Sequence, residues 1–316
     1  MFNVLQISTG YSDGSVEKGI IEENGGLHTL ISSETEEDII AAGRQADGLL
    51  VALTKVSKTV INALPDLKII VRAGIGLDNI DLPTAKARGI KVYNLPHYCQ
   101  NEVADHTIAL LLAMERRLTP QLEDIRNGNW NPVKNYMPIN GLDGAVLGLI
   151  GCGGIAQKVI KRAKPFGLKI VCYDPYVSEI SAKELEIDLV SLNNLLETSD
   201  FISLHIPLTE ETKFILNKDA FEKMKPNVYI INTARGPLID NNALYSAVTE
   251  GRIWGAALDT IDGDAEGAVR FSGFENILIT PHTAYYSEIS NWKIRAQAGE
   301  LFAKYINGTE MPFSFT

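Results

Sequence analysis

Short apolar runs rich in β-branched residues alternate along this chain with longer amphipathic or polar segments. Nearly continuous apolar strands that alternate with helices are typical of parallel sheets covered by helices on both faces. The pattern therefore predicts an α/β fold. The predicted strands are Val4–Ile7, Leu49–Leu53, Lys68–Val71, Lys91–Tyr93, Val146–Ile150, Lys169–Tyr173, Phe201–Leu204, Val228–Ile231, Ala256–Leu258 and Ile277–Ile279.

One predicted helix is longer and more apolar than the others. Asn101–Leu118 is the longest uninterrupted helical pattern, and Leu110–Leu112 with Met114 make much of its circumference apolar. The polar stretch at 127–140 indicates a loop after it. Because 316 residues exceed what one hydrophobic core usually supports, we expect two domains. The boundary is expected near residue 100, with a second sheet that starts at Val146.

The composition is that of an ordinary globular chain, with 45% hydrophobic and 22% charged residues. The net charge of −10 disfavours nucleic-acid and anionic-membrane partners, because phosphate contacts need a basic surface. No run approaches the roughly 20 apolar residues of a membrane helix. Since Met1–Gly10 does not resemble a signal peptide, we expect a cytoplasmic protein. The scattered cysteines predict reduced, packed thiols: Cys99, Cys152 and Cys172.

A glycine-rich segment follows the predicted strand that ends at Ile150. Gly151 permits a tight turn, Gly153 lets the backbone approach a pyrophosphate, and Ala156 permits close helix packing. Asp174 ends the next strand, where a carboxylate binds an adenosine ribose and disfavours a 2′-phosphate. The alternatives are that the glycines form a turn that binds no ligand and that Asp174 only caps a helix or a turn. The combination favours a dinucleotide-binding unit that prefers NAD to NADP.

The segment Val71–Asp81 places two glycines beside Arg72 after an apolar strand. Exposed backbone amides in such a turn can clasp a carboxylate. An ordinary strand-to-helix turn has the same pattern, and the residues favour neither interpretation.

Three further predicted strands end in residues suited to chemistry. Arg235, Asp259 and His282 follow separate strands, and ligands of open α/β sheets bind at the carboxyl ends of strands. An arginine, an acid and a histidine at one edge indicate an anchor for a carboxylate together with a proton donor.

These motifs, in this order and spacing, resemble the D-isomer-specific 2-hydroxyacid dehydrogenases, which include D-lactate and D-3-phosphoglycerate dehydrogenases. The resemblance covers nearly the whole chain. It implies a Rossmann NAD-binding domain at 100–282, inserted into a flavodoxin-like, discontinuous substrate domain at 1–99 plus 283–316. It also implies a homodimer, with the long helix after residue 100 at the interface.

The resemblance implies a role for each motif. His282 is expected to donate a proton to the 2-oxo oxygen, Arg235 to bind and polarise the substrate, and Asp259 to orient the nicotinamide. The expected substrate contacts are Ala73, Gly74, Ile75, Gly76, Tyr98, Arg235 and Tyr285. The expected cofactor contacts are Gly151, Gly153, Ile155, Ala156, Asp174, Ile206, Pro207, Thr212, Thr233, Ala234, Arg235, Asp259 and His282. No metal is expected.

The chain departs from the family at the acid that pairs with the histidine. The family has a glutamate followed by proline, whereas this chain has Asp264 in a short loop, with Glu266 and Asp262 as alternatives. Aspartate supplies the same charge with one methylene less of reach. Of the other histidines, we expect His106 to be packed and His205 to line the cofactor cleft, while His28 has no partner visible in the sequence.

The leading hypothesis is an NAD-dependent oxidoreductase that interconverts a small 2-oxo acid and its D-2-hydroxy acid. A formate or phosphite dehydrogenase of the same fold is disfavoured, because formate dehydrogenases of this family carry glutamine at the acid position. A non-catalytic NAD-sensing protein, like the corepressors of this superfamily, is the alternative from another class. Since the chain ends at Thr316, we do not expect the regulatory domain of longer phosphoglycerate dehydrogenases.

Overall fold

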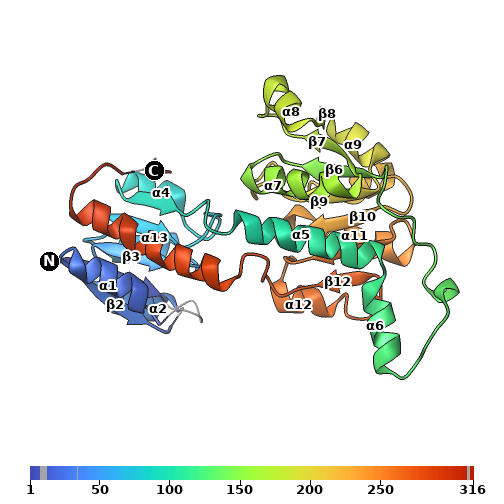
Figure 1. Ribbon diagram of the computed structural model, residues 1–316. Helices are drawn as coiled ribbons and strands as arrows, with labels where there is room; N and C mark the ends of the chain where they lie inside the picture. Colours follow the sequence, from blue (N-terminus) through green and yellow to red (C-terminus); the bar gives the residue numbers. More distant parts are fainter. Residues whose placement is uncertain (8–12, 34, 312–313) are drawn as a thin grey trace. The chain divides into compact units, whose positions relative to one another are not determined.

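The computed structural model describes residues 1–7, 13–33, 35–311 and 314–316. The chain divides into two compact units (Figure 1). Unit 1 consists of Met1–Cys99 together with Ser287–Thr316, and unit 2 consists of Gln100–Tyr286. Unit 2 is therefore inserted into the sequence of unit 1.

Unit 1 is built on a parallel sheet in the order β2-β1-β3-β4-β5, which is the strand order of flavodoxin-like folds. Its apolar core includes Leu5, Leu49 and Ile70. The elements are β1 (Phe2–Ile7), α1 (Ser15–Glu23), β2 (Gly26–Ile31), α2 (Glu36–Gly43), β3 (Gly48–Val51), α3 (Lys58–Ala63), β4 (Ile69–Arg72), α4 (Leu82–Ala87), β5 (Lys91–Asn94) and α13 (Glu288–Ile306).

Unit 2 is built on a parallel seven-stranded sheet in the order β12-β11-β10-β9-β6-β7-β8. The elements are α5 (Gln100–Glu115), α6 (Leu118–Arg126), η1 (Val133–Asn135), β6 (Val146–Ile150), α7 (Gly154–Ala163), η2 (Lys164–Phe166), β7 (Lys169–Tyr173), α8 (Glu179–Leu185), β8 (Asp188–Leu189), α9 (Leu192–Thr198), β9 (Phe201–Leu204), α10 (Lys218–Lys223), β10 (Tyr229–Asn232), η3 (Gly236–Leu238), α11 (Asn241–Thr249), β11 (Gly255–Leu258), α12 (Asp264–Val269) and β12 (Ile277–Ile279).

Helices cover both faces of the unit 2 sheet. Successive residues of a strand enter different clusters: Tyr229 and Ile231 pack with α5 and α7, whereas Ile230 packs with α9 and α11. A strand buried on both faces has to be apolar at every position. This explains why the apolar runs predicted most of the strands, and the structure confirms the predicted α/β fold. All three cysteines are free and buried, as predicted.

The structure corrects two predictions of secondary structure. The strands β2 and β8 were missed, because they are edge strands without a continuous apolar run. The predicted helix at 101–118 ends at Glu115, since Arg117 adopts a left-handed conformation with φ of 52° before α6 begins. Among the described residues α13, with 19 residues, is the longest helix.

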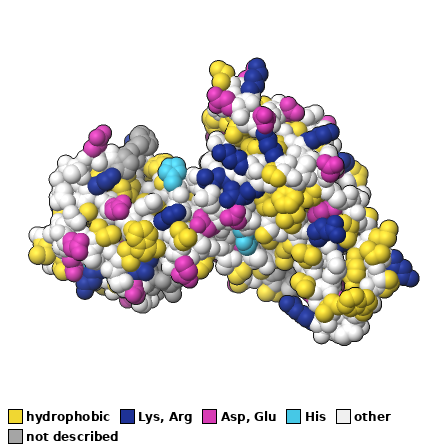
Figure 2. Space-filling model, viewed as in Figure 1, with side chains coloured by type: hydrophobic (Ala, Val, Ile, Leu, Met, Phe, Trp, Pro, Cys, Tyr) yellow, Lys and Arg dark blue, Asp and Glu magenta, His cyan; other side chains and the backbone are white. Residues whose placement is uncertain are grey.

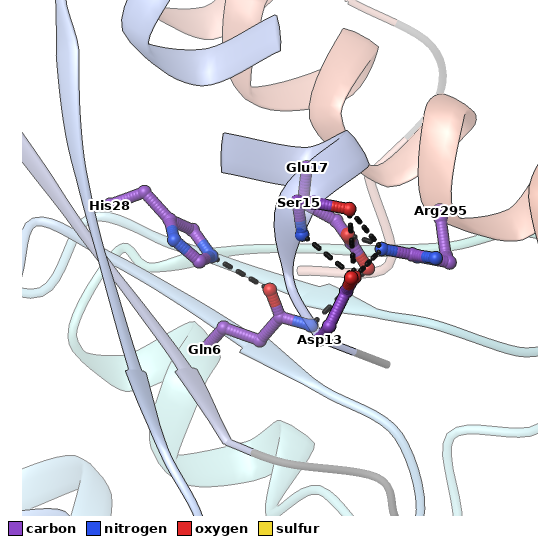
Figure 3. A network of polar contacts seen from close by, with 6 residues as sticks. All are labelled: Gln6, Asp13, Ser15, Glu17, His28 and Arg295. Atoms are coloured by element: carbon purple, nitrogen blue, oxygen red, sulfur yellow. Dashed lines mark hydrogen bonds and ion pairs between the residues drawn. The ribbon is translucent and has the colours of Figure 1, made fainter. Parts of the chain in front are cut away.

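Helix α13 is joined to α1 by a network of polar side chains that is buried around Glu17 and exposed at Asp13 and Ser15 (Figure 3). Arg295 of α13 donates from Nε to Glu17 Oε2 at 3.1 Å and from Nη2 to Asp13 and Ser15. The Glu17 side chain is only 3% exposed. Hydrogen bonds from Ser15 and Arg295 hold the pKa of Asp13 at about 2. The network therefore fixes a C-terminal helix to the N-terminal strand and helix of the same unit.

The same network extends to the edge strand. Gln6 donates from Nε2 to the other Glu17 oxygen at 3.2 Å, and Gln6 Oε1 lies 2.7 Å from His28 Nε2. Because Gln6 Oε1 can only accept, His28 carries a proton on Nε2. Burial lowers the pKa of His28. The histidine without a visible partner in the sequence is thus a buried structural residue of β2.

None of the helices formed by the described residues is both long and apolar enough to cross a membrane. The same residues contain no group of three or more His, Cys, Asp or Glu side chains arranged to hold a metal ion.

Arg295→Met is expected to destabilise the protein by about 3 kcal/mol or more, because the buried Glu17 carboxylate loses its guanidinium partner. Lys18→Met is the matched control, since it breaks the exposed Lys18–Glu22 pair at 3.9 Å on α1. That change is expected to alter stability by less than about 1 kcal/mol. Urea denaturation measures both variants, and equal losses would contradict a special contribution from the Arg295–Glu17 pair.

Candidate functional site

The last residues of six strands in unit 2 lie in one row across the sheet. Tyr173 pairs in register with Ile150, Ile150 with Leu204, Leu204 with Asn232, Asn232 with Leu258, and Leu258 with Ile279. We call these six residues the strand-end row. The predicted site residues of unit 2 come one to eight positions after a residue of this row: Asp174 directly follows Tyr173, and Thr212 is the eighth residue after Leu204. The parallel sheet therefore brings turns from distant parts of the sequence to one edge.

The glycine turn after β6 is as tight as the sequence predicted. Gly151 has a φ of 99°, and a Cβ on it would lie 2.5 Å from the carbonyl oxygen of His205. Gly153 caps α7 with an ordinary φ of −69°, and a Cβ on it would meet nothing within 4 Å. Gly151 thus serves the fold, whereas the space above Gly153 is open to a ligand. Ile155 is half-buried and Ala156 is buried against the sheet.

Asp174 is tied to the glycine turn. Its Oδ2 accepts from the Cys152 amide at 2.8 Å and its Oδ1 from the Tyr176 amide at 2.9 Å. The carboxylate is half-buried. Since each carboxylate oxygen has two acceptor positions, Asp174 retains capacity to accept from a ribose hydroxyl.

The turn after β10 is held by the side chain of Asn232, which is fully buried. Asn232 Oδ1 accepts from the Ala234 amide at 3.0 Å, and its Nδ2 donates to the Arg235 carbonyl at 2.8 Å. Thr233 makes a 3.0 Å hydrogen bond with Thr107 of α5. Arg235 is half-buried and donates from Nη1 to the Ala234 carbonyl. The arginine is therefore held close to its own backbone turn.

The segment after β9 forms a closed loop. Thr212 donates its hydroxyl to the Pro207 carbonyl at 2.7 Å and accepts from the Thr209 amide, while Ile206 is half-buried. Burial lowers the pKa of His205 to about 4, and Ser203 Oγ lies 2.9 Å from its Nε2. His205 is therefore neutral near pH 7, which does not suit a proton donor.

His282 lies in a turn after β12 that is anchored to Asp259. The His282 amide donates to the Asp259 carbonyl at 2.9 Å. The Asp259 carboxylate accepts from the amides of Thr283 and Ala284, each at 2.9 Å. His282 has a φ of 53°, a conformation that non-glycine residues rarely adopt and that its surroundings have to stabilise. Its ring packs edge-on against Tyr285, with ring centroids 5.9 Å apart.

The sequence interpretation missed two residues that also contact Asp259. Thr280 donates its hydroxyl to Asp259 Oδ1 at 2.6 Å. His106 of α5 lies with Nε2 3.5 Å from the same oxygen and 3.0 Å from Thr280 Oγ1. Its side chain is a quarter exposed, so it is less packed than expected. No pattern in the sequence distinguishes it from the other polar residues of α5.

The acids proposed as partners of the histidine lie around the start of α12. Asp264 and Glu266 are exposed and Asp262 is half-buried. Asp264 has a φ of 44° and donates its amide to the Ile261 carbonyl. Its carboxylate therefore reaches solvent from the first residue of the helix.

The predicted substrate segment of unit 1 follows β4. The amides of Ala73 and Gly74 donate to the carbonyls of Val51 and Arg72. Those of Ile75 and Gly76 have no acceptor among the described residues. A Cβ on Gly74 would collide with the Arg72 guanidinium, which explains the glycine. Tyr98, the other candidate of unit 1, is buried.

Comparisons with known proteins place the chain in a family. Residues 108–284 match the family model described as D-isomer specific 2-hydroxyacid dehydrogenase, NAD binding domain. The crystal structure of D-lactate dehydrogenase from Aquifex aeolicus, complexed with NAD and lactic acid, superimposes with a TM-score of 0.87. It is 31% identical, and the match covers 97% of this chain and 96% of that one.

Two curated relatives are similar in sequence. A hydroxypyruvate reductase of Thermotoga maritima is 43% identical over 242 residues, 75% of this chain and 78% of that protein. A D-3-phosphoglycerate dehydrogenase of Methanocaldococcus jannaschii is 38% identical over 289 residues, 91% of this chain. The match covers 54% of that dehydrogenase, so this chain spans about half its length. From the family model and these relatives, the chain belongs to the D-isomer-specific 2-hydroxyacid dehydrogenase family and carries its NAD-binding domain.

Proposed function

We propose that this protein catalyses the NAD-dependent interconversion of a small 2-oxo acid and the corresponding D-2-hydroxy acid. The observation that carries the proposal is the strand-end row, because it assembles the glycine turn, Arg235 and the anchored His282 at one edge of the unit 2 sheet. In this proposal unit 2 is the NAD-binding domain and unit 1 the substrate-binding domain.

The residues present fit a dinucleotide. The open space above Gly153 and the first amides of α7 suit a pyrophosphate, since a helix N-terminus attracts anions. Asp174 would accept from the adenosine ribose and oppose the 2′-phosphate of NADP. Ile155, Ile206, Pro207, Thr212, Thr233 and Ala234 would line the rest of the cofactor. When bound, NADH supplies a hydride to the 2-oxo carbon.

The remaining residues would hold the substrate and move the proton. The Ile75 and Gly76 amides suit the substrate carboxylate better than those of Ala73 and Gly74, which already donate within unit 1. The Arg235 guanidinium would polarise the 2-oxo group. His282 would donate the proton to the 2-oxo oxygen and take it back in the reverse direction. Asp264 would stabilise the charged imidazole, and Tyr98 and Tyr285 would shape the substrate pocket.

A non-catalytic NAD-sensing protein is the less favoured alternative. Such a protein needs the glycine turn but has no need of a histidine held in a left-handed conformation by a buried carboxylate. The anchored turn at His282 therefore supports catalysis.

We further propose that the protein forms a homodimer, and that α6 makes the contact. The apolar residues of α5 pack into the core of unit 2 itself. Figure 2 shows hydrophobic side chains gathered over α6 and the segment after it. These exposed side chains are Leu118, Leu122, Ile125, Trp130, Val133 and Met137. The segment is held in place, because Tyr136 donates to Asp124 and Glu115 accepts from the Gly141 amide.

Purified protein is expected to oxidise NADH, in preference to NADPH, with at least one acid from a panel of pyruvate, hydroxypyruvate and 3-phosphohydroxypyruvate. His282→Gln is expected to lower kcat by about 10²- to 10⁴-fold, as loss of a general acid does. The absorbance of the reduced nicotinamide measures both the cofactor preference and the kcat. Tight NADH binding without turnover of any 2-oxo acid would instead favour the sensor.

The same assay tests whether Asp264 is the acid that pairs with His282. Asp264→Asn is expected to change the pH–rate profile, because the charge that stabilises the His282 imidazolium is removed. An unchanged profile would refute the role of Asp264 and direct attention to Glu266 and Asp262.

Two alanine substitutions separate the fold from cofactor binding in the glycine turn. Gly151→Ala is expected to reduce both stability and NADH affinity, because the Cβ collides with the His205 carbonyl. Gly153→Ala is expected to keep the wild-type Tm but weaken NADH binding by at least about tenfold, or about 1.4 kcal/mol. Calorimetric titration and thermal denaturation measure the two effects. Wild-type affinity in Gly153→Ala would show that no pyrophosphate approaches this glycine.

The double variant Leu122→Lys/Ile125→Lys is expected to have the mass of one chain in light scattering, whereas the wild type has the mass of two. Buried lysines would break an apolar interface. Ile180→Lys, at an even more exposed apolar position on α8, is the control that keeps the dimer. A dimeric double variant would place the interface elsewhere.

A further inference from the structure

The contact between His106 and the turn of His282 extends the proposed function. His106 lies on α5, far in sequence from the strands that carry the proposed active-site residues, yet it reaches Thr280 and Asp259. Both of those residues follow the strand-end row directly. The distances between these three side chains determine which group donates each hydrogen bond.

The proton positions follow from the chemistry of the groups. A carboxylate only accepts hydrogen bonds, so the 2.6 Å contact between Thr280 Oγ1 and Asp259 Oδ1 uses the single proton of the hydroxyl. The threonine oxygen can then only accept from His106, 3.0 Å away. His106 therefore carries a proton on Nε2 and shares it between Thr280 Oγ1 and, at 3.5 Å, Asp259 Oδ1.

Asp259 depends on such donors because its side chain is only 1% exposed. A buried carboxylate is costly unless hydrogen bonds compensate for lost water. Its donors are the Thr280 hydroxyl and the amides of Thr283 and Ala284, with the His106 N–H beside them. These donors lie on both sides of His282, whose own amide binds the Asp259 carbonyl. The carboxylate thus fixes the turn from either flank.

We propose that His106 is a positioning residue for the reaction: its Nε2–H orients Thr280 and Asp259 and thereby keeps His282 in its left-handed conformation. The inference rests on the proposed role of His282 as the proton donor. His106 is not assigned contact with substrate or cofactor, and it acts only through the Asp259 clamp. We define this clamp as His106, Thr280 and Asp259.

The test compares variants that remove or keep the donor. His106→Leu is expected to lower kcat for 2-oxo acid reduction by about 10- to 100-fold, the effect of a small misplacement of a catalytic group. The KM for the 2-oxo acid should change much less. His106→Gln places an N–H near the same point and is expected to retain most of the activity. Asp105→Asn, which alters the neighbouring exposed ion pair with Arg162, is the control and should match the wild type.

A second variant tests the same link, so that a folding defect in His106→Leu alone does not decide the result. Thr280→Val keeps the shape of the side chain but removes the hydroxyl that links His106 to Asp259. It is expected to lose activity as His106→Leu does, and the double variant should lose little more than either single one, because both break the same link. Wild-type kcat in His106→Leu, an equal loss in His106→Gln, or fully additive losses would each overturn the inference.

Hydrogen exchange provides a readout that needs no substrate. The amides of His282, Thr283 and Ala284 all bind Asp259. Peptides covering 280–286 should therefore exchange faster in His106→Leu and at the wild-type rate in His106→Gln. If the wild type reduces no 2-oxo acid, the proposed function fails and exchange alone decides this inference. Unchanged exchange in His106→Leu would overturn it.

Discussion

The parallel hydrogen-bond ladder of the seven-stranded sheet is the constraint on which the rest of unit 2 depends. Six of its seven strands end in register, so their last residues stand in one row. Every turn that leaves this row starts from a fixed position and direction. The glycine turn, the Asn232 turn and the Asp259-anchored turn are consequences of that alignment. Each then uses a local device, a glycine, a buried amide or a buried carboxylate, to fix its own shape.

Much of this fold was predictable from the sequence, because strands covered on both faces have to be apolar throughout. Phe201–Leu204 and Ile277–Ile279 were predicted at the bounds observed. Strand β2 was not predicted, because it is not apolar throughout. Its inward position His28 is polar, while its outward Leu27 is 46% exposed. Only the contact with Gln6 explains a histidine facing inwards, and that contact belongs to the tertiary structure.

The position of a candidate residue in the fold was predictable where its motif lies directly beside a strand. Gly151, Arg235 and His282 each follow a strand end, so the rule for open α/β sheets located them. The contacts of Asp259 with His106 and Thr280 could not be predicted, because these two partners are 174 residues apart in the chain. The neighbourhood of Asp264 was also unpredictable. Gly263 and Asp264 both have positive φ angles, and the direction of such a loop depends on backbone angles that the residue types do not specify.

The Arg295–Glu17 contact joins residues 278 positions apart, with the whole of unit 2 between them in the sequence. During synthesis, β1 and α1 leave the ribosome long before α13 exists. Until then Glu17 has no arginine to bury against, and α1 cannot acquire its final cover. Unit 2 is a continuous segment and needs nothing from residues after 286 to complete its sheet. Because α13 follows the whole of unit 2 in the sequence, the Arg295–Glu17 contact of unit 1 can form only after all of unit 2 has been synthesised.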